Sequence, residues 1–229
     1  MKEITKTLYT FKELLRNAEI HPRIWTAAVE KVRGQLREWI TDGDWHDYTV
    51  ELWTNALNQV GFENATIAFS GFSCQGDGAS FSADIDTKKI LKFLTSTIKP
   101  NNCIKANKKG EEQFLPWVVH KLGWAILKPN PEFHKLKRHC DAIELKVERT
   151  DSHYSHENTC DIRGEFYGPE KLSDTYNQFE KNVESLRYDL CKAIYNSLED
   201  DYHAQTEDEA LIDFSEANEY HWDDKGRME

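Results

Sequence analysis

Hydrophobic residues in the first part of the chain recur at the three- and four-residue spacing that is typical of one face of an α-helix. Thr10 and Glu13 form a capping box that predicts a short first helix, which Pro22 ends at His21. A second helix is expected from Pro22 to about residue 41, and a third from Asp44, its predicted cap, to residue 61. The apolar faces of these two helices are Trp25, Val29, Val32, Leu36 and Trp39, then Trp45, Tyr48, Leu52, Ala56 and Val60.

The middle of the chain changes to the alternating apolar and polar pattern of half-buried strands. Residues 65–69 and 81–85 predict one hairpin, whose strands are joined by a Gly-rich loop. Residues 143–147 and 160–166 predict a second hairpin with one dry face and one wet face, joined by a His-rich loop. Between the hairpins we expect a helix capped by Asp86 and running to about Lys99, a mobile surface loop over 100–112, a helix within 113–125 and an irregular segment over 126–139.

The longest helix is predicted after Pro169, where apolar residues follow one face as far as Leu198. We expect this stripe to lie on the sheet rather than to form a coiled coil. A second capping box, Thr206 to Glu209, predicts a further helix to about Asn218. Helices that alternate with hairpins predict an α+β fold, with an antiparallel sheet of about four strands and helices packed on it. We expect a single domain over 1–229, with a division into a helical part, 1–62, and a sheet-containing part, 63–229, as the alternative.

Composition excludes several classes of protein. No apolar run approaches the roughly 20 residues of a membrane-spanning helix, and the N-terminus lacks the apolar block of a signal peptide. We therefore expect a cytoplasmic protein with no membrane partner. The five cysteines are odd in number and contain no CxxC motif, so we expect reduced thiols rather than a disulfide framework.

Charge is distributed unevenly along the chain, whose net charge is −11. Residues 88–140 contain 12 Lys or Arg and three Glu, whereas residues 199–229 contain 12 acidic and two basic residues. The simplest explanation is that the two segments neutralise each other in the fold. The alternatives are a basic surface that binds nucleic acid and an acidic surface that binds a basic partner. We expect the acidic segment to fold, with Glu207, Asp208, Asp213, Glu216, Asp223 and Asp224 directed outward.

Two polar loops hold the candidate chemistry. Gln75 and Asp77 lie among three glycines of the first loop and are candidate binding residues, although a decorated hairpin turn explains the same glycines. The second loop adds His153, Tyr154, His156 and Glu157. If both hairpins share a sheet and their loops lie at the same end, then Asp77, His153, His156 and Glu157 converge as candidate acid–base catalysts.

A metal site is the other interpretation of the second loop. His153, His156 and Cys160 have the donor atoms that zinc prefers, but residues i and i+3 of a strand point to opposite faces. We therefore predict no metal and no cofactor. A polar turn or a protein-contact loop is the alternative role for these residues.

Three stretches resemble a family of small phage and prophage accessory proteins: FSGFSCQGDGASF at 69–81, HYSHENT at 153–159 and ANEYHWDDKGR at 217–227. Cys74 departs from the serine expected in the first stretch, which argues against a hydroxyl nucleophile there. The resemblance implies a phage origin, and accessory phage proteins of this size commonly bind and block a host system.

We therefore expect a non-enzymatic interaction protein in the host-cell cytoplasm, which inhibits or modulates a host defence or nucleic-acid-handling complex. Its partner is expected to be a host bacterial protein or ribonucleoprotein, bound through Gln75, Asp77 and Tyr154 and through Asp213, Glu216, Asp223 and Asp224. Direct nucleic-acid binding is expected to use residues 88–138. The alternative is a small hydrolase that acts on nucleotides or nucleic acid through Asp77, His153, His156 and Glu157.

Overall fold

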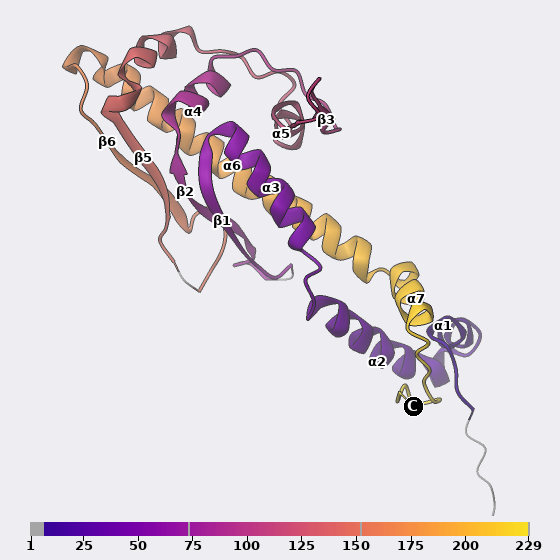
Figure 1. Ribbon diagram of the computed structural model, residues 1–229. Helices are drawn as coiled ribbons and strands as arrows, with labels where there is room; N and C mark the ends of the chain where they lie inside the picture. The colour runs from indigo at the N-terminus through magenta and orange to yellow at the C-terminus, as the bar shows by residue number, and fades with distance from the viewer. Residues whose placement is uncertain (1–6, 73, 152, 229) are drawn as a thin grey trace, which may run out of the picture. The chain divides into compact units, whose positions relative to one another are not determined.

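The computed structural model describes residues 7–72, 74–151 and 153–228 (Figure 1). The backbone contacts divide the chain into two compact units. One unit comprises Tyr48–Leu198, and the other combines the chain up to Asp47 with the chain from Glu199 onward. The described residues form seven α-helices and an antiparallel sheet of four strands, which confirms the predicted α+β class. The expectation that the whole chain folds as one domain stays a prediction.

The four-stranded sheet belongs to the unit Tyr48–Leu198 and consists of the two predicted hairpins side by side. Its strands are β1 Phe62–Ser70, β2 Gly78–Ile85, β5 Ile143–Arg149 and β6 Cys160–Phe166, all antiparallel and in the order β1-β2-β5-β6. The edge strand β1 contains a bulge between Glu63 and Thr66, where Asn64 adopts a positive φ of 53°. The opposite edge strand, β6, carries Asp161, Arg163 and Glu165 on its exposed side.

The dry face of the sheet packs against the long helix α6, Ser173–Thr206, whose residues up to Leu198 belong to this unit (Figure 1). The predicted apolar stripe of α6 is buried from Leu172 to Leu198. Phe166 of β6 stacks on Tyr176 of α6 with ring centroids 4.9 Å apart. These contacts confirm that the stripe covers the sheet.

Helix α3, Asp47–Val60, packs on the same core through Trp53, Ala56, Leu57 and Val60. The predicted cap at Asp44 is wrong, because the helix begins at Asp47 and the Asp44 carbonyl accepts from the Asp47 amide in a turn that precedes the helix. Tyr48, which the spacing places on the apolar face of this helix, is 74% exposed. The true face is rotated about the helix axis and is formed by Trp53, Ala56, Leu57 and Val60.

Helix α4, Thr87–Leu94, begins where predicted, since the Asp86 side chain accepts from the amides of Lys88 and Lys89. It ends five residues earlier than predicted. The hydroxyls of Thr95 and Ser96 donate to the carbonyls of Leu91 and Lys92, and such side chains compete with the helical backbone.

The segment between α4 and β5 is more regular than predicted. The expected loop over 100–112 contains a small hairpin of β3, Lys105–Ala106, and β4, Glu112–Gln113, whose turn is held by the Asn107 side chain. Helix α5, Leu115–Lys121, lies within the predicted helical region. The segment 126–139, for which an irregular structure is predicted, contains most of a 3-10 helix, η1, Pro131–Ala142. Asn130 caps this helix, and Phe133 and Leu136 are buried on one side of it.

The second unit has a smaller core of its own. Helices α1, Phe11–Ile20, and α2, Pro22–Thr41, pack with α7, Asp208–Ala217, around the fully buried Trp222. The predicted capping box is present, since the Thr10 hydroxyl accepts from the Glu13 amide and the Glu13 carboxylate accepts from the Thr10 amide. The segment around Trp222 pairs with Tyr9 and Met228 through isolated bridges.

The second predicted capping box is wrong. Thr206 still belongs to α6, where its hydroxyl donates to the Tyr202 carbonyl, so it is not available to cap the next helix. Glu207 is the first residue outside α7 and makes no side-chain cap. Within the described parts of the chain, no helix is both long enough and apolar enough to span a bilayer.

Candidate functional site

The two hairpin loops meet at one end of the four-stranded sheet, as predicted. The Ser70 hydroxyl donates to the Ser155 carbonyl over 3.3 Å. Gly78, the first residue of β2, lies so close to the other loop that a Cβ added there would stand 2.5 Å from the Cβ of His156. A Cβ on Gly76 would likewise lie 3.2 Å from the ring of Tyr154, which is 56% exposed. The glycines therefore allow one loop to pack on the other.

The candidate catalytic residues mainly shape these loops. Asp77 accepts from the Cys74 amide over 2.5 Å, and His156 Nδ1 accepts from the Asn158 amide over 3.1 Å. The Glu157 carbonyl accepts from the guanidinium of Arg187 on α6. His153 is exposed and contributes its backbone amide to the Asp151 carboxylate. These bonds account for the shape of the loops and give no specific support for catalysis.

Asp151 is a loop residue that the sequence analysis missed. Its carboxylate accepts from the amides of His153 and Tyr154, and these bonds lower its pKa below the ordinary value. Among the residues that the structure describes, no group of three or more His, Cys, Asp or Glu side chains is placed to hold a metal ion. The absence of a zinc site and of a cofactor stays a prediction.

The acidic C-terminal segment differs from the prediction at two residues. Asp223 is 1% exposed and not directed outward, because it accepts from the amides of Lys225 and Arg227 and pairs with the Arg227 guanidinium. Burial opposes its ionisation, but these bonds outweigh that effect and lower its pKa well below the ordinary value. Asp208 pairs with Arg33 through two hydrogen bonds. The remaining members, Glu207, Asp213, Glu216 and Asp224, are exposed as predicted.

A basic pocket of about 630 Å³ lies between η1 and the short 3-10 helix η2, Glu170–Leu172. Its lining contains three permanently cationic side chains, two imidazoles, one leucine and no carboxylate: Lys135, Arg138, Lys171, His134, His139 and Leu172. We call this site the basic pocket.

The geometry of η1 explains how this pocket forms. Side chains three residues apart are aligned in a 3-10 helix. Phe133 and Leu136 therefore share the buried side, where Phe133 contacts the ring of Phe179 on α6 with centroids 5.6 Å apart. Lys135 and Arg138 share a neighbouring, exposed ridge. A departure from helical geometry at His139, with φ −124° and ψ 16°, then turns the chain toward β5.

The cations of the basic pocket are only partly neutralised. Lys135 pairs with Glu132, one turn earlier on η1. Within the described residues, Arg138 and Lys171 have no ion pair, and both side chains are exposed. Nearby on η1, Asp141 is occupied by Lys88 over 2.9 Å. The pocket therefore presents two cations without an ion pair among the described residues, and Arg138 has a planar set of donors.

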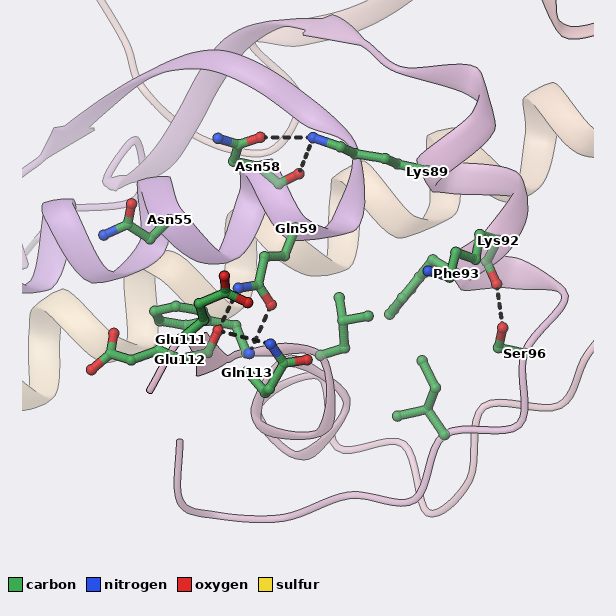
Figure 2. A pocket seen from close by; sticks show the side chains of 13 residues that line it. Asn55, Asn58, Gln59, Lys89, Lys92, Phe93, Ser96, Glu111, Glu112 and Gln113 are labelled. Carbon is green, nitrogen blue, oxygen red and sulfur yellow. Dashed lines mark hydrogen bonds between the residues drawn. The ribbon is translucent and has the colours of Figure 1, made fainter. Parts of the chain in front are cut away.

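The larger cavity of this unit is a groove of about 690 Å³ between α3, α4 and the β3–β4 hairpin. Figure 2 shows the amides of Asn55 and Gln59 on one side and Lys92 on the other. Gln59 ties the hairpin to α3, since it donates to the Glu112 carbonyl over 2.7 Å and accepts from the Phe114 amide over 2.9 Å. Two lysines and two glutamates line the groove, so it lacks the charge that would select an anion.

The sheet, its covering helix and these two cavities belong to the unit Tyr48–Leu198 of an α+β protein. The chain belongs to the family described as Domain of unknown function (DUF8835), whose model matches residues 45–208. That range includes the basic pocket, the groove and both hairpin loops, but not Asp213, Glu216, Asp223 or Asp224. Comparisons with curated proteins and with solved structures find no match.

The sequence analysis identified part of the basic pocket and missed the rest. Lys135 and Arg138 fall in the basic segment 88–138, which was a candidate for nucleic-acid binding. Lys171 lies 33 residues beyond Arg138, and no spacing rule connects the two. Their proximity arises from η1 and η2, neither of which was predicted.

Proposed function

We propose that this chain is a non-enzymatic protein that binds the phosphate backbone of a nucleic acid through the basic pocket. The observation that carries the proposal is the lining itself, in which three cations and two imidazoles surround one cavity without a carboxylate. Phosphate oxygens are the acceptors that such a set of donors recognises, and arginine can engage two of them at once. The basic pocket lies beside the exposed ridge formed by Lys135 and Arg138, so a long polymer can reach it as well as a small anion.

The distribution of charge supports the same location. The unit Tyr48–Leu198 contains 19 basic and 20 acidic residues, so it is close to neutral, whereas the rest of the chain carries nearly all of the net charge of −11. Within a nearly neutral unit, a local cluster of cations creates a positive potential that extends about 8–10 Å at physiological salt. Two of the six acidic residues that the sequence predicts to face outward form ion pairs within the fold, Asp208 with Arg33 and Asp223 with Arg227. The acidic surface is therefore smaller than predicted, which favours the basic pocket as the binding site.

The resemblance to phage accessory proteins supports a host nucleic-acid complex as the source of this ligand. Under the proposal, the protein occupies phosphate groups that a host defence or nucleic-acid-handling complex needs, and so modulates that complex in the host cytoplasm. The hydrolase alternative gains no specific observation: Asp77 and His156 accept from loop amides, while Glu157 and His153 are held in the loop through backbone atoms.

The test is equilibrium binding to end-labelled single-stranded RNA, single-stranded DNA and duplex DNA, measured by fluorescence anisotropy over a salt series. The double variant Arg138→Gln/Lys171→Gln removes the two unpaired cations of the basic pocket. The matched control, Lys105→Gln/Lys109→Gln, removes two exposed lysines from the β3–β4 hairpin region. Both variants change the net charge equally, so a difference between them reports the site and not the overall charge.

We expect the pocket variant to bind at least about tenfold more weakly and the control to bind like the parent. The slope of log affinity against log salt should fall by about 1.4 for single strands and about 1.8 for duplex, as for two lost phosphate contacts. Equal binding by the two variants, or no binding by the parent at low salt, would contradict the proposal. Cleavage of the labelled strand that is lost in His156→Ala would instead favour the hydrolase.

A further inference from the structure

Two buried thiols from distant parts of the chain meet beneath the second hairpin. Cys160 begins β6, and Cys191 lies on the face of α6 that covers the sheet. Their sulfur atoms are 3.7 Å apart and hydrogen-bonded, and the two residues are 0% and 1% exposed. The other cysteines are separate from this pair: Cys74 and Cys103 are exposed, and Cys140 is buried on η1.

A buried arginine is directed at this pair. Arg187 precedes Cys191 by one turn of α6 and is only 3% exposed. Its Nη1 donates to the sulfur of Cys160 over 3.1 Å and to the Glu157 carbonyl, while Glu184 accepts from the other side of the guanidinium. The Glu184 carboxylate compensates the guanidinium on that side, and the Nη1 bond to Cys160 is left for a sulfur acceptor, which is weak as a thiol and strong as a thiolate. The geometry is that of a site for a thiolate.

The electrostatics agree with this geometry. The hydrogen bond from Cys191 lowers the pKa of Cys160, burial opposes the shift, and the charge of Arg187 adds to it. The same hydrogen bond, together with burial, raises the pKa of Cys191. One member of the pair is thus favoured as the thiolate and the other as the thiol, which is the arrangement of a nucleophilic cysteine and its resolving partner.

We propose that Cys160 and Cys191 are a site of reversible oxidation that closes an internal disulfide, with Arg187 as the positioning residue that holds the Cys160 thiolate. The sulfurs must approach by roughly 1.7 Å to reach the bond length of about 2.05 Å. Because both sulfurs are buried, the oxidant must be small, and the reaction needs local opening of the hairpin loop that Arg187 anchors through Glu157.

A low-molecular-weight disulfide is a sufficient oxidant. The Cys160 thiolate attacks one of its sulfurs, forms a mixed disulfide and releases the first small thiolate, which takes up a proton from solvent. Cys191 then loses its proton and attacks the Cys160 sulfur, so that the internal disulfide forms and the second small thiol leaves. Two protein thiols are oxidised, one small disulfide is reduced, and the two thiol protons end on the two small thiols.

Oxidation removes one charge from the surroundings of Arg187 without removing its contact with the hairpin loop. Once the disulfide closes, the thiolate that faces Arg187 is gone, and the guanidinium keeps Glu184 and the Glu157 carbonyl. The new bond also ties β6 covalently to α6. The redox state of the pair is thereby connected to the loop that packs on Gly78.

The experiment uses the full chain with Cys74→Ser/Cys103→Ser, which removes both exposed thiols and leaves three. After incubation with oxidised glutathione, thiols are counted in denaturant. We expect three thiols before oxidation and one after it. Adding Cys160→Ser should give two before and two after, whereas adding Cys140→Ser, the matched control for a buried thiol, should give two before and none after.

Peptide mapping of the unsubstituted protein keeps the test independent of any variant that fails to fold. Trypsin should release residues 150–163 joined to residues 188–192, and reduction should separate them. Three thiols that survive oxidation, a bond to Cys140, or glutathione retained on Cys160 would each overturn the proposal. For Arg187, we expect Arg187→Gln to oxidise about three- to tenfold more slowly than Arg187→Lys. Equal rates in the two variants would overturn its assigned role.

Discussion

The contact between the two hairpin loops can be tested with one added carbon atom. Gly78 begins β2 and is buried beneath the second loop. In Gly78→Ala, the new Cβ would stand 2.5 Å from the Cβ of His156, 2.7 Å from its Cα and 3.0 Å from the Ser155 carbonyl oxygen. Two of these three neighbours are backbone atoms, so rotation of a side chain cannot relieve the overlap.

The size of the effect follows from these distances. Carbon atoms in contact normally lie about 3.5–4.0 Å apart, so the second loop must move by about 1 Å. Overpacking of this kind costs about 1–3 kcal/mol. For a chain of this length, each 1 kcal/mol lowers the melting temperature by about 2–4 °C. We therefore expect a decrease of about 2–12 °C.

The assay is urea unfolding followed by tryptophan fluorescence and circular dichroism, with thermal unfolding as a second measurement. Gly34→Ala is the matched control, since Gly34 lies inside the exposed part of α2 with no atom within 4 Å of the added carbon. That change should raise the free energy of unfolding by about 0.8–1 kcal/mol because alanine favours a helix. If Gly78→Ala were as stable as the parent, the loops would not be in contact as described.

Three further predictions concern other parts of the chain. Gln59→Ala should lower the free energy of unfolding by about 1–3 kcal/mol, because two hydrogen bonds are lost, and hydrogen exchange of the β3–β4 hairpin should become faster. Thr10→Ala should cost about 1 kcal/mol in urea unfolding, since α1 loses its cap. The lowered pKa of Asp223 means that its carboxylate stabilises the fold above about pH 4 and ceases to do so as the pH falls. Between pH 5 and about 2.5, a range that spans the ordinary aspartate pKa of about 3.9, urea midpoints should therefore fall less steeply in Asp223→Asn than in the parent.

Alternation and capping predicted the elements of this fold well. The strands appear within a few residues of their predicted ends, and the alternation is clearest in β5, whose buried and exposed residues follow one another. Asp86 predicted the start of α4 but nothing predicted its end, since the apolar spacing continues to Ile98 while the Thr95 and Ser96 hydroxyls compete for the backbone. For this helix, the local pattern therefore located the start better than the end.

Strand register could not be predicted from side-chain charge. On the wet face of β5 and β6, residues of the same sign lie opposite each other: Glu144 and Glu165, Lys146 and Arg163, Glu148 and Asp161. Charge alone would favour a register in which β6 is shifted by two residues along β5, because residues of opposite sign would then lie opposite each other. Gly164 explains the observed register, because a Cβ there would meet the Glu144 carbonyl and the Leu145 side chain.

The candidate site was harder to predict than the fold, since it depends on segments that are distant in sequence. The approach of the hairpin loops followed from the matching strand pattern and was confirmed. The basic pocket needed Lys171 beside Arg138, and the thiol pair needed Cys160 beside Cys191, 31 residues away. Neither pairing leaves a signal in the spacing of residues along the chain.

The two outer strands of the sheet also bear on how the protein behaves when it is concentrated. A sheet edge with free backbone groups can recruit a strand from another molecule, and repeated recruitment leads to fibrils. Here the bulge around Asn64 distorts the backbone of β1, and the alternating charges Asp161, Arg163 and Glu165 line β6. An incoming strand would meet an irregular ladder at one edge and would have to accommodate a row of charges at the other. Both edges of the sheet thus resist the edge-to-edge addition of strands from other molecules. The bulge and the row of charges therefore disfavour aggregation when the protein is concentrated.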